Sequence, residues 1–117
     1  MDSELVITIG DKVVRLKLKS QAIITLEKIY GKNIFEIFKD LSVTVMADIF
    51  YKSLVNKDEL PNISKMEDLM DLLLEKYSLL ELGDEILNQL AVRSGILKQS
   101  DLEDDKTPQS LEEIKNV

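Results

Sequence analysis

Two short apolar segments near the N-terminus alternate with a period of two residues and are joined by a Gly-Asp pair. Leu5–Ile9 and Val13–Leu18 place every second side chain on one side of an extended strand. Gly10-Asp11 suits the two-residue loop of a β-hairpin. The chain is therefore expected to begin with an antiparallel hairpin over residues 5–18.

The length of the loop also fixes the register of this hairpin. The expected opposing pairs are Ile9 with Lys12, Ile7 with Val14, and Leu5 with Leu16. The large aliphatic side chains then share one face, and Arg15, Lys17 and Lys19 form a small basic strip on the other. An isolated hairpin is marginally stable in water, so the remaining chain must cover its apolar face.

The remaining chain has the periodicity and the capping residues of helices. Ser20, Ser42 and Ser78 are expected N-caps, Ser64-Lys65-Met66-Glu67 fits a capping box, and Gly31 is an expected left-handed stop. Helices are predicted at about residues 20–30, 33–40, 42–56, 64–77 and 78–97. Val43–Val45 also suits a strand, because it is rich in β-branched residues.

These elements predict an α+β fold, with an N-terminal β-hairpin followed by a small bundle of about four to five helices. Residues 1–97 are expected to form a single globular domain, since 117 residues leave room for one core. Residues 98–117 are expected to be a flexible acidic tail. Thr107-Pro108 and Ser110 are helix-start signals, so residues 108–116 could form a short helix. Such a short helix would be ordered only when it docks on a surface.

The composition narrows the classes of function. The chain has no His and no Cys, which removes the usual general base, the thiolate nucleophile and the common zinc ligands except carboxylate. A net charge of −7 disfavours nucleic acid as a partner. No apolar run reaches the roughly 20 residues of a membrane span, and no secretory signal is recognisable. We expect a cytoplasmic protein that is not an enzyme, with no cofactor and no membrane partner.

Acidic clusters offer little site chemistry. Asp101, Glu103, Asp105 and Glu112 match four positions of a calcium loop, but Lys106 stands where the loop requires a sharp turn. The pairs Glu67/Asp71, Asp68/Asp71 and Asp84/Glu85 are expected on the polar faces of helices, where they solvate the surface. No metal site and no catalytic residue is predicted.

Apolar side chains on the last two predicted helices are the candidate binding site. Methionine is flexible and occurs at surfaces that bind varied partners, although core filling is the alternative role. The predicted site is an apolar groove between these helices, for a protein partner. It comprises Met66, Leu69, Met70, Leu73, Tyr77, Ile86, Leu87 and Leu90.

The stretch VITIGDKVVRLKLKSQAIITLEKIYGKNIFEIF, which contains the Leu26-Glu27 pair and Gly31, resembles the start of the tail assembly chaperones of long-tailed bacteriophages and prophages. The resemblance is detailed over about residues 5–41 and concerns only the number of amphipathic helices over 42–97. It implies a non-structural protein of the host bacterial cytoplasm that binds the tape measure protein and helps recruit tail tube subunits. It assigns no individual site residue.

Two other functions stay open from the sequence. A small acidic inhibitor or regulator would use its charge to occupy a basic site on a host protein. An enzyme that uses only carboxylates and lysine would need a concave pocket with buried acids. A homo-oligomer is also open, because hairpin edges allow pairing between copies.

Overall fold

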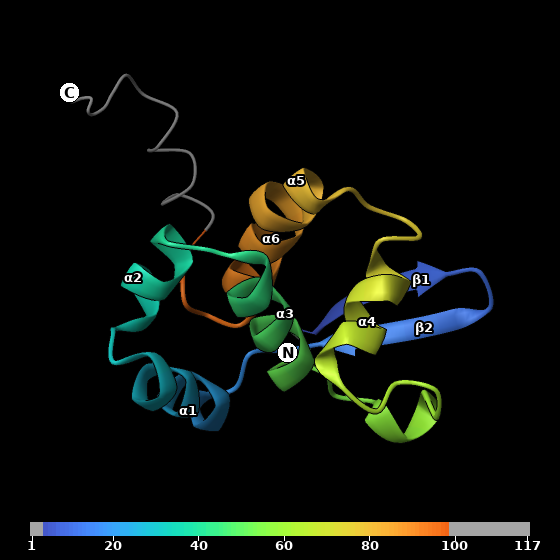
Figure 1. Ribbon diagram of the computed structural model, residues 1–117, viewed down its shortest axis with the longest axis horizontal. Coiled ribbons are helices and arrows are strands. Elements are labelled where there is room, and N and C mark those ends of the chain that lie inside the picture. The colour runs from blue at the N-terminus through green and yellow to red at the C-terminus, as the bar shows by residue number, and fades with distance from the viewer. Residues whose placement is uncertain (1–3, 99–117) are drawn as a thin grey trace.

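The computed structural model describes residues 4–98. A two-stranded antiparallel hairpin is followed by helices, which is the predicted α+β layout (Figure 1). The predicted acidic tail after Lys98, with the helix over 108–116, lies outside the described residues. The elements are β1 (Leu5–Ile9), β2 (Lys12–Leu16), α1 (Ser20–Tyr30), α2 (Ile34–Lys39), α3 (Val43–Lys52), η1 (Lys57–Glu59), α4 (Met66–Leu73), α5 (Leu79–Glu81), η2 (Leu82–Ile86) and α6 (Leu87–Arg93).

The hairpin has the predicted register. Ile9 pairs with Lys12, and the pairing continues to Leu5 and Leu16. Gly10 has a φ of 61°, which the tight turn requires and which glycine adopts without steric cost. The apolar face is buried against the helices, as expected for a hairpin that cannot persist alone. Its buried side chains are Leu5, Ile7, Ile9, Val14 and Leu16.

The segment after α3 lies along the outer edge of β2, a feature that the sequence did not predict. The backbone N–H of Lys17 donates to the carbonyl of Ser53 at 2.8 Å, and the N–H of Val55 donates to the carbonyl of Arg15 at 2.9 Å. A bridge between Leu16 and Leu54 lies between these two bonds. The helix predicted to run to about residue 56 therefore ends at Lys52, and the chain continues as a short extended segment.

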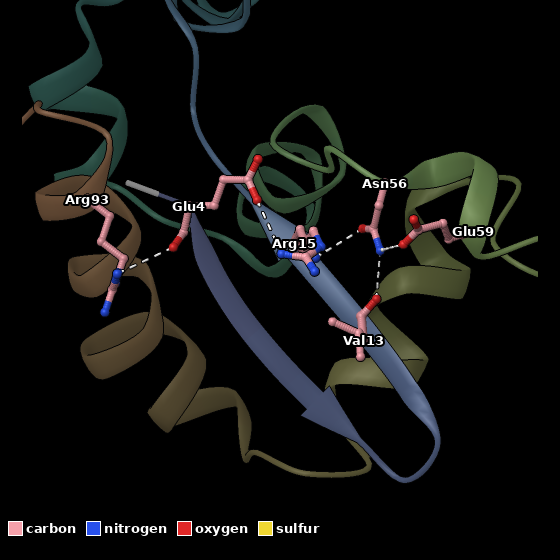
Figure 2. A network of polar contacts seen from close by, with 6 residues as sticks. All are labelled: Glu4, Val13, Arg15, Asn56, Glu59 and Arg93. Carbon is pink, nitrogen blue, oxygen red and sulfur yellow. Dashed lines mark hydrogen bonds and ion pairs between the residues drawn. The ribbon is translucent and has the colours of Figure 1, made fainter. Parts of the chain in front are cut away.

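Asn56 completes this edge with its side chain (Figure 2). Its Oδ1 accepts a hydrogen bond from the backbone N–H of Arg15 at 3.0 Å, and its Nδ2 donates to the carbonyl of Val13 at 2.8 Å. The same amide nitrogen donates to Glu59 at 2.8 Å. Asn56 is 5% exposed, so these three bonds satisfy a buried polar group.

α1 and α2 lie at the end of the molecule opposite the hairpin turn (Figure 1). Gly31 ends α1 with a φ of 65°, as predicted. The expected cap at Ser20 is wrong: α1 begins at Ser20 itself, after Lys19, and has no side-chain cap. Asn33 does cap α2, because its side chain accepts from the N–H of Glu36 and the Glu36 carboxylate accepts from the N–H of Asn33.

α4 begins two residues later than predicted, and its capping carboxylate is different. Asp68, and not Glu67, reaches back to accept hydrogen bonds from the backbone N–H groups of Ser64 at 3.0 Å and Lys65 at 3.2 Å. The helix starts at Met66 and ends at Leu73. Asp68 lies one residue after Glu67, and this position directs its carboxylate toward the backbone of Ser64 and Lys65, which precede the helix.

The last predicted helix forms as three connected pieces. Ser78 and Glu81 make the predicted capping box at the start of α5. A π-helical turn, η2, follows and includes Gly83, and α6 ends at Arg93. Within residues 4–98, no helix combines the length and the apolar character that crossing a lipid bilayer requires.

Candidate protein-binding site

Most of the predicted groove residues lie in the hydrophobic core, so they do not form an accessible groove. Only Met66 and Tyr77 are partly exposed, and Tyr77 lies beyond the end of α4. The helical period identified the buried faces correctly, but it does not distinguish a core from a groove. The six buried side chains are Leu69, Met70, Leu73, Ile86, Leu87 and Leu90.

A different apolar groove lies between the start of α3 and the α5–η2 segment. Its volume is about 370 Å³. Most of the lining side chains are aliphatic, and Asp84 is the one charged residue among them. We call this site the α3–α5 groove, and it is lined by Leu41, Ser42, Val43, Met46, Leu79, Leu80, Gly83 and Asp84.

Several side chains of the α3–α5 groove are exposed although they are aliphatic. Leu80 is 73% exposed, Val43 is 52% exposed and Leu79 is 43% exposed. A single exposed aliphatic residue is ordinary, but three that line one groove form a continuous apolar surface. This surface is the strongest candidate for contact with another molecule among the residues that the structure describes.

Two helix caps hold these exposed residues in place. The Ser42 hydroxyl accepts from the N–H of Val45 at 3.1 Å and starts α3, so Val43 occupies its first position. The Ser78 hydroxyl accepts from the N–H of Glu81 at 3.1 Å and starts α5. The caps fix the backbone of both walls, which means that the groove is largely formed before a partner arrives.

The π-helical turn η2 adds one wall of the groove. Such turns are rare, and they occur frequently at functional sites. Gly83 lies on this turn, and a Cβ placed there would lie 3.8 Å from the Sδ of Met46 on α3. Met46 is only 5% exposed, so with no side chain at Gly83 its thioether forms the buried floor of the groove.

Of the predicted acidic pairs, Asp84/Glu85 borders the α3–α5 groove through Asp84, and the other two pairs lie outside it. Glu67, Asp71, Asp84 and Glu85 are exposed. The backbone N–H of Ser64 donates to Asp68 and holds the pKa of this carboxyl below its usual value. A general acid needs the opposite shift. Within residues 4–98, no group of three acidic residues has the geometry of a metal site.

The sequence feature that marks the groove is a pair of helix starts, each with aliphatic residues directly after the N-cap. Leu79-Leu80 follows the Ser78 cap directly and lies off the stripe of α6, and Val43 follows the Ser42 cap in the same way. Phe35, in the first turn of α2 after the Asn33 cap, is likewise 55% exposed. An apolar residue in the first turn after a cap can therefore be exposed, whereas the residues at helical spacing on α4 and α6 are buried.

The residues that carry the phage resemblance all have structural roles. Leu26 is fully buried, and Gly31 terminates α1. The Glu27 carboxylate accepts from the backbone N–H of Ile34 at 2.8 Å and so joins α1 to the start of α2.

Comparison of the chain with models of protein families, with curated proteins and with solved structures finds no match.

Proposed function

We propose that this protein is a tail assembly chaperone that holds an apolar segment of a protein client without catalysis. The client is the tape measure protein of a long-tailed bacteriophage, and the complex helps to recruit tail tube subunits in the host bacterial cytoplasm. The observation that carries the proposal is the α3–α5 groove, with Val43, Leu79 and Leu80 exposed along it. The resemblance over residues 5–41 supplies the identity of the client.

The shape and composition of the groove suit an amphipathic helix. A helix presents apolar side chains at intervals of three and four residues, and a groove of about 370 Å³ accommodates a few of them. Burial of exposed aliphatic surface contributes about 25 cal/mol per Å². Leu80 is the most exposed of the wall residues and gains most from such burial.

The charges beside the groove favour a client with basic residues next to its apolar face. Asp84 lines the groove, and Glu81 and Glu85 are exposed on the same helical segment. Opposite charges at the rim accelerate encounter and select the partner more than they add affinity. The net charge of −7 also keeps a complex with an aggregation-prone client in solution.

The experiment is a pull-down with the tape measure and tail tube proteins encoded beside this chain. Leu80→Asp places a charge in the apolar wall, and the first turn of a helix tolerates aspartate well. We expect this variant to weaken client binding by about tenfold or more, through lost burial and a desolvated charge. Ile24→Asp is the matched control, because Ile24 is 52% exposed on α1 and does not line the groove.

Salt separates this function from the acidic inhibitor. A client held through apolar contacts stays bound at moderate salt, whereas a complex held by charge dissociates as the charges are screened. Loss of the complex at moderate salt, or equal effects of the Leu80 and Ile24 substitutions, would favour the inhibitor. Absence of any complex with either phage protein at micromolar concentration would overturn the proposed function.

A further inference from the structure

The two long edges of the hairpin differ in their hydrogen bonding. The outer edge of β2 is covered by the segment from Ser53 to Asn56, which takes the N–H and C=O of Arg15 and the C=O of Val13. Within residues 4–98, no backbone segment is hydrogen-bonded along the outer edge of β1, and the nearest element there, α6, contacts β1 and sends the Arg93 side chain to the Glu4 carbonyl. The β2 edge of the hairpin is therefore hydrogen-bonded to the segment Ser53–Asn56, and the β1 edge has no comparable partner within residues 4–98.

The register shows which groups of β1 point outward. Arg15 uses both backbone groups on the far side of β2, so Arg15 and its opposite residue Val6 form a pair without hydrogen bonds between the strands. The same argument applies to Val13 and Thr8. The N–H and C=O of Val6 and the N–H of Thr8 consequently face away from the hairpin. None of the hydrogen bonds described for residues 4–98 uses them.

Two cationic side chains occupy the ends of this edge. Lys76 Nζ donates to the carbonyl of Thr8 at 2.9 Å, and Arg93 Nη1 donates to the carbonyl of Glu4 at 3.3 Å (Figure 2 shows the Arg93 contact). Residues four apart on a strand are separated by about 13 Å. The edge is thus a short row of open backbone groups, centred on Val6, between two positive charges.

We propose that the β1 edge is a second binding surface, which accepts an extended peptide strand with acidic residues at both of its ends. The strand would pair with the open groups of Val6 and Thr8. Its carboxylates would meet Lys76 and Arg93, which are exposed and flexible enough to leave the carbonyls and pair with the peptide. This surface is separate from the α3–α5 groove and does not depend on the function proposed for it.

Charge favours such a strand over a second copy of the protein. Two β1 edges related by a two-fold axis through Val6 would place Thr8 of one copy opposite Glu4 of the other. Lys76 of one copy would then approach Arg93 of the other at both ends of the pairing. Like charges opposed in this way are unfavourable, whereas glutamates at both ends of a peptide complement them.

The outer face of the hairpin suits the side chains of the same peptide. Val6 is 47% exposed, and Thr8 beside it is exposed as well. Alternating valine and threonine on an added strand would extend this face with favourable cross-strand pairs. Arg15 lies on the same face, where its charge is balanced by an ion pair of 3.6 Å with the Glu4 carboxylate, so Arg93 and Lys76 remain the cations for the acidic ends of the peptide.

The test uses the full chain and a synthetic peptide that alternates valine and threonine, with a pair of glutamates at each end. We expect binding that protects the amide protons of Val6 and Thr8 from exchange, measured by NMR. The matched peptide with lysines at both ends should bind about tenfold more weakly. The double substitution Lys76→Glu and Arg93→Glu should weaken binding of the glutamate peptide about tenfold.

The control is Lys57→Glu with Lys65→Glu, which makes the same change in net charge at residues outside the β1 edge. It should leave the affinity within about twofold. Equal affinity for the two peptides, or protection of amides elsewhere than on β1, would overturn the proposal. Self-association that protects Val6 and Thr8 without peptide would overturn the choice of occupant.

Discussion

The side-chain amide of Asn56 donates a hydrogen bond of 2.8 Å to the backbone carbonyl of Val13, a residue 43 positions earlier in the chain. The bond joins the extended segment that follows α3 to the N-terminal hairpin. The Asn56 side chain also accepts a hydrogen bond from the backbone N–H of Arg15. This one buried side chain therefore makes the two hydrogen bonds to β2 that the backbone of a neighbouring strand would otherwise make. The hairpin is held at this edge by a polar group and not only by apolar packing.

Asn56→Ala should lower the free energy of unfolding by about 2–3 kcal/mol, because it leaves the N–H of Arg15 and the C=O of Val13 without their partner in a part-buried site. Urea denaturation measures the change. Asn62→Ala is the control, since Asn62 is exposed and should change the stability by no more than about 0.5 kcal/mol. Equal losses in the two variants would contradict the role assigned to Asn56.

Gly31→Ala should lower the free energy of unfolding by about 1 kcal/mol. A Cβ at Gly31 would meet nothing within 4 Å, so the cost comes only from the left-handed φ of 65°. Gly83→Ala is the opposite case, because its φ is not left-handed and a Cβ would make an ordinary contact of 3.8 Å with Met46. The gain in helix propensity should stabilise this variant by up to about 1 kcal/mol.

Thermal unfolding of the two glycine variants, followed by circular dichroism, compares them directly. Equal shifts of the melting temperature in the same direction would contradict the distinction. The comparison also tests the α3–α5 groove, since the added methyl group at Gly83 lies on its wall and should reduce client binding without a loss of stability.

The hairpin could be predicted in detail because its signals are local. Alternation from Leu5 to Ile9 and the Gly10-Asp11 loop determine the register, and no distant residue can change it without exposing an apolar face. The stop at Gly31 and the box at Ser78 are similarly local. By contrast, the pairing of Ser53–Asn56 with β2 depends on contacts about 40 residues apart, which periodicity does not encode.

The binding site was harder to predict than the fold. Leu69 and Leu90 have the helical spacing that predicts a binding face, and that spacing results from their burial in the core. Periodicity does not identify Leu80, because an exposed residue follows no period of its own. Which apolar faces meet each other is a tertiary property, and the surface that remains exposed becomes visible only after those faces are paired.

The Asp68 carboxylate stabilises the start of α4, and this stabilisation is lost at low pH. The backbone N–H of Ser64, followed by smaller contributions that include the N–H of Lys65, lowers the pKa of Asp68 below its usual value of 3.8. A depressed pKa in the folded state means that this stabilisation is present above pH 3.8 and is lost as the pH falls through the folded value. Asp68→Asn should therefore reduce the acid dependence of the unfolding free energy.

Urea denaturation of the wild type and Asp68→Asn at neutral pH and in acid measures this difference. Glu67→Gln is the control, because Glu67 is the neighbouring carboxylate and makes no cap at this helix. We expect the wild type and Glu67→Gln to lose stability in parallel, and the advantage of the wild type over Asp68→Asn to shrink with acid. An advantage that is constant with pH would contradict the capping role.

Tyr30 gives the corresponding prediction in base. Burial, together with a hydrogen bond of 2.7 Å to the Asp48 carboxylate and the charge of that group, raises the pKa of Tyr30 from 10.0 to about 12. The folded state holds the phenolic proton more tightly than the unfolded state, so its stabilising effect is complete below pH 10.0 and is lost as the pH rises to about 12. Tyr30→Phe should lower stability by about 1 kcal/mol at neutral pH, and this deficit should disappear between those two values. The difference between the unfolding free energies of wild type and variant measures it, since groups that the two proteins share cancel. Asp48→Asn should move the tyrosinate absorbance transition of Tyr30 downward but leave it above pH 10.0, because burial is the largest cause of the shift. A deficit that does not change with pH would contradict the assignment of the raised pKa to Tyr30.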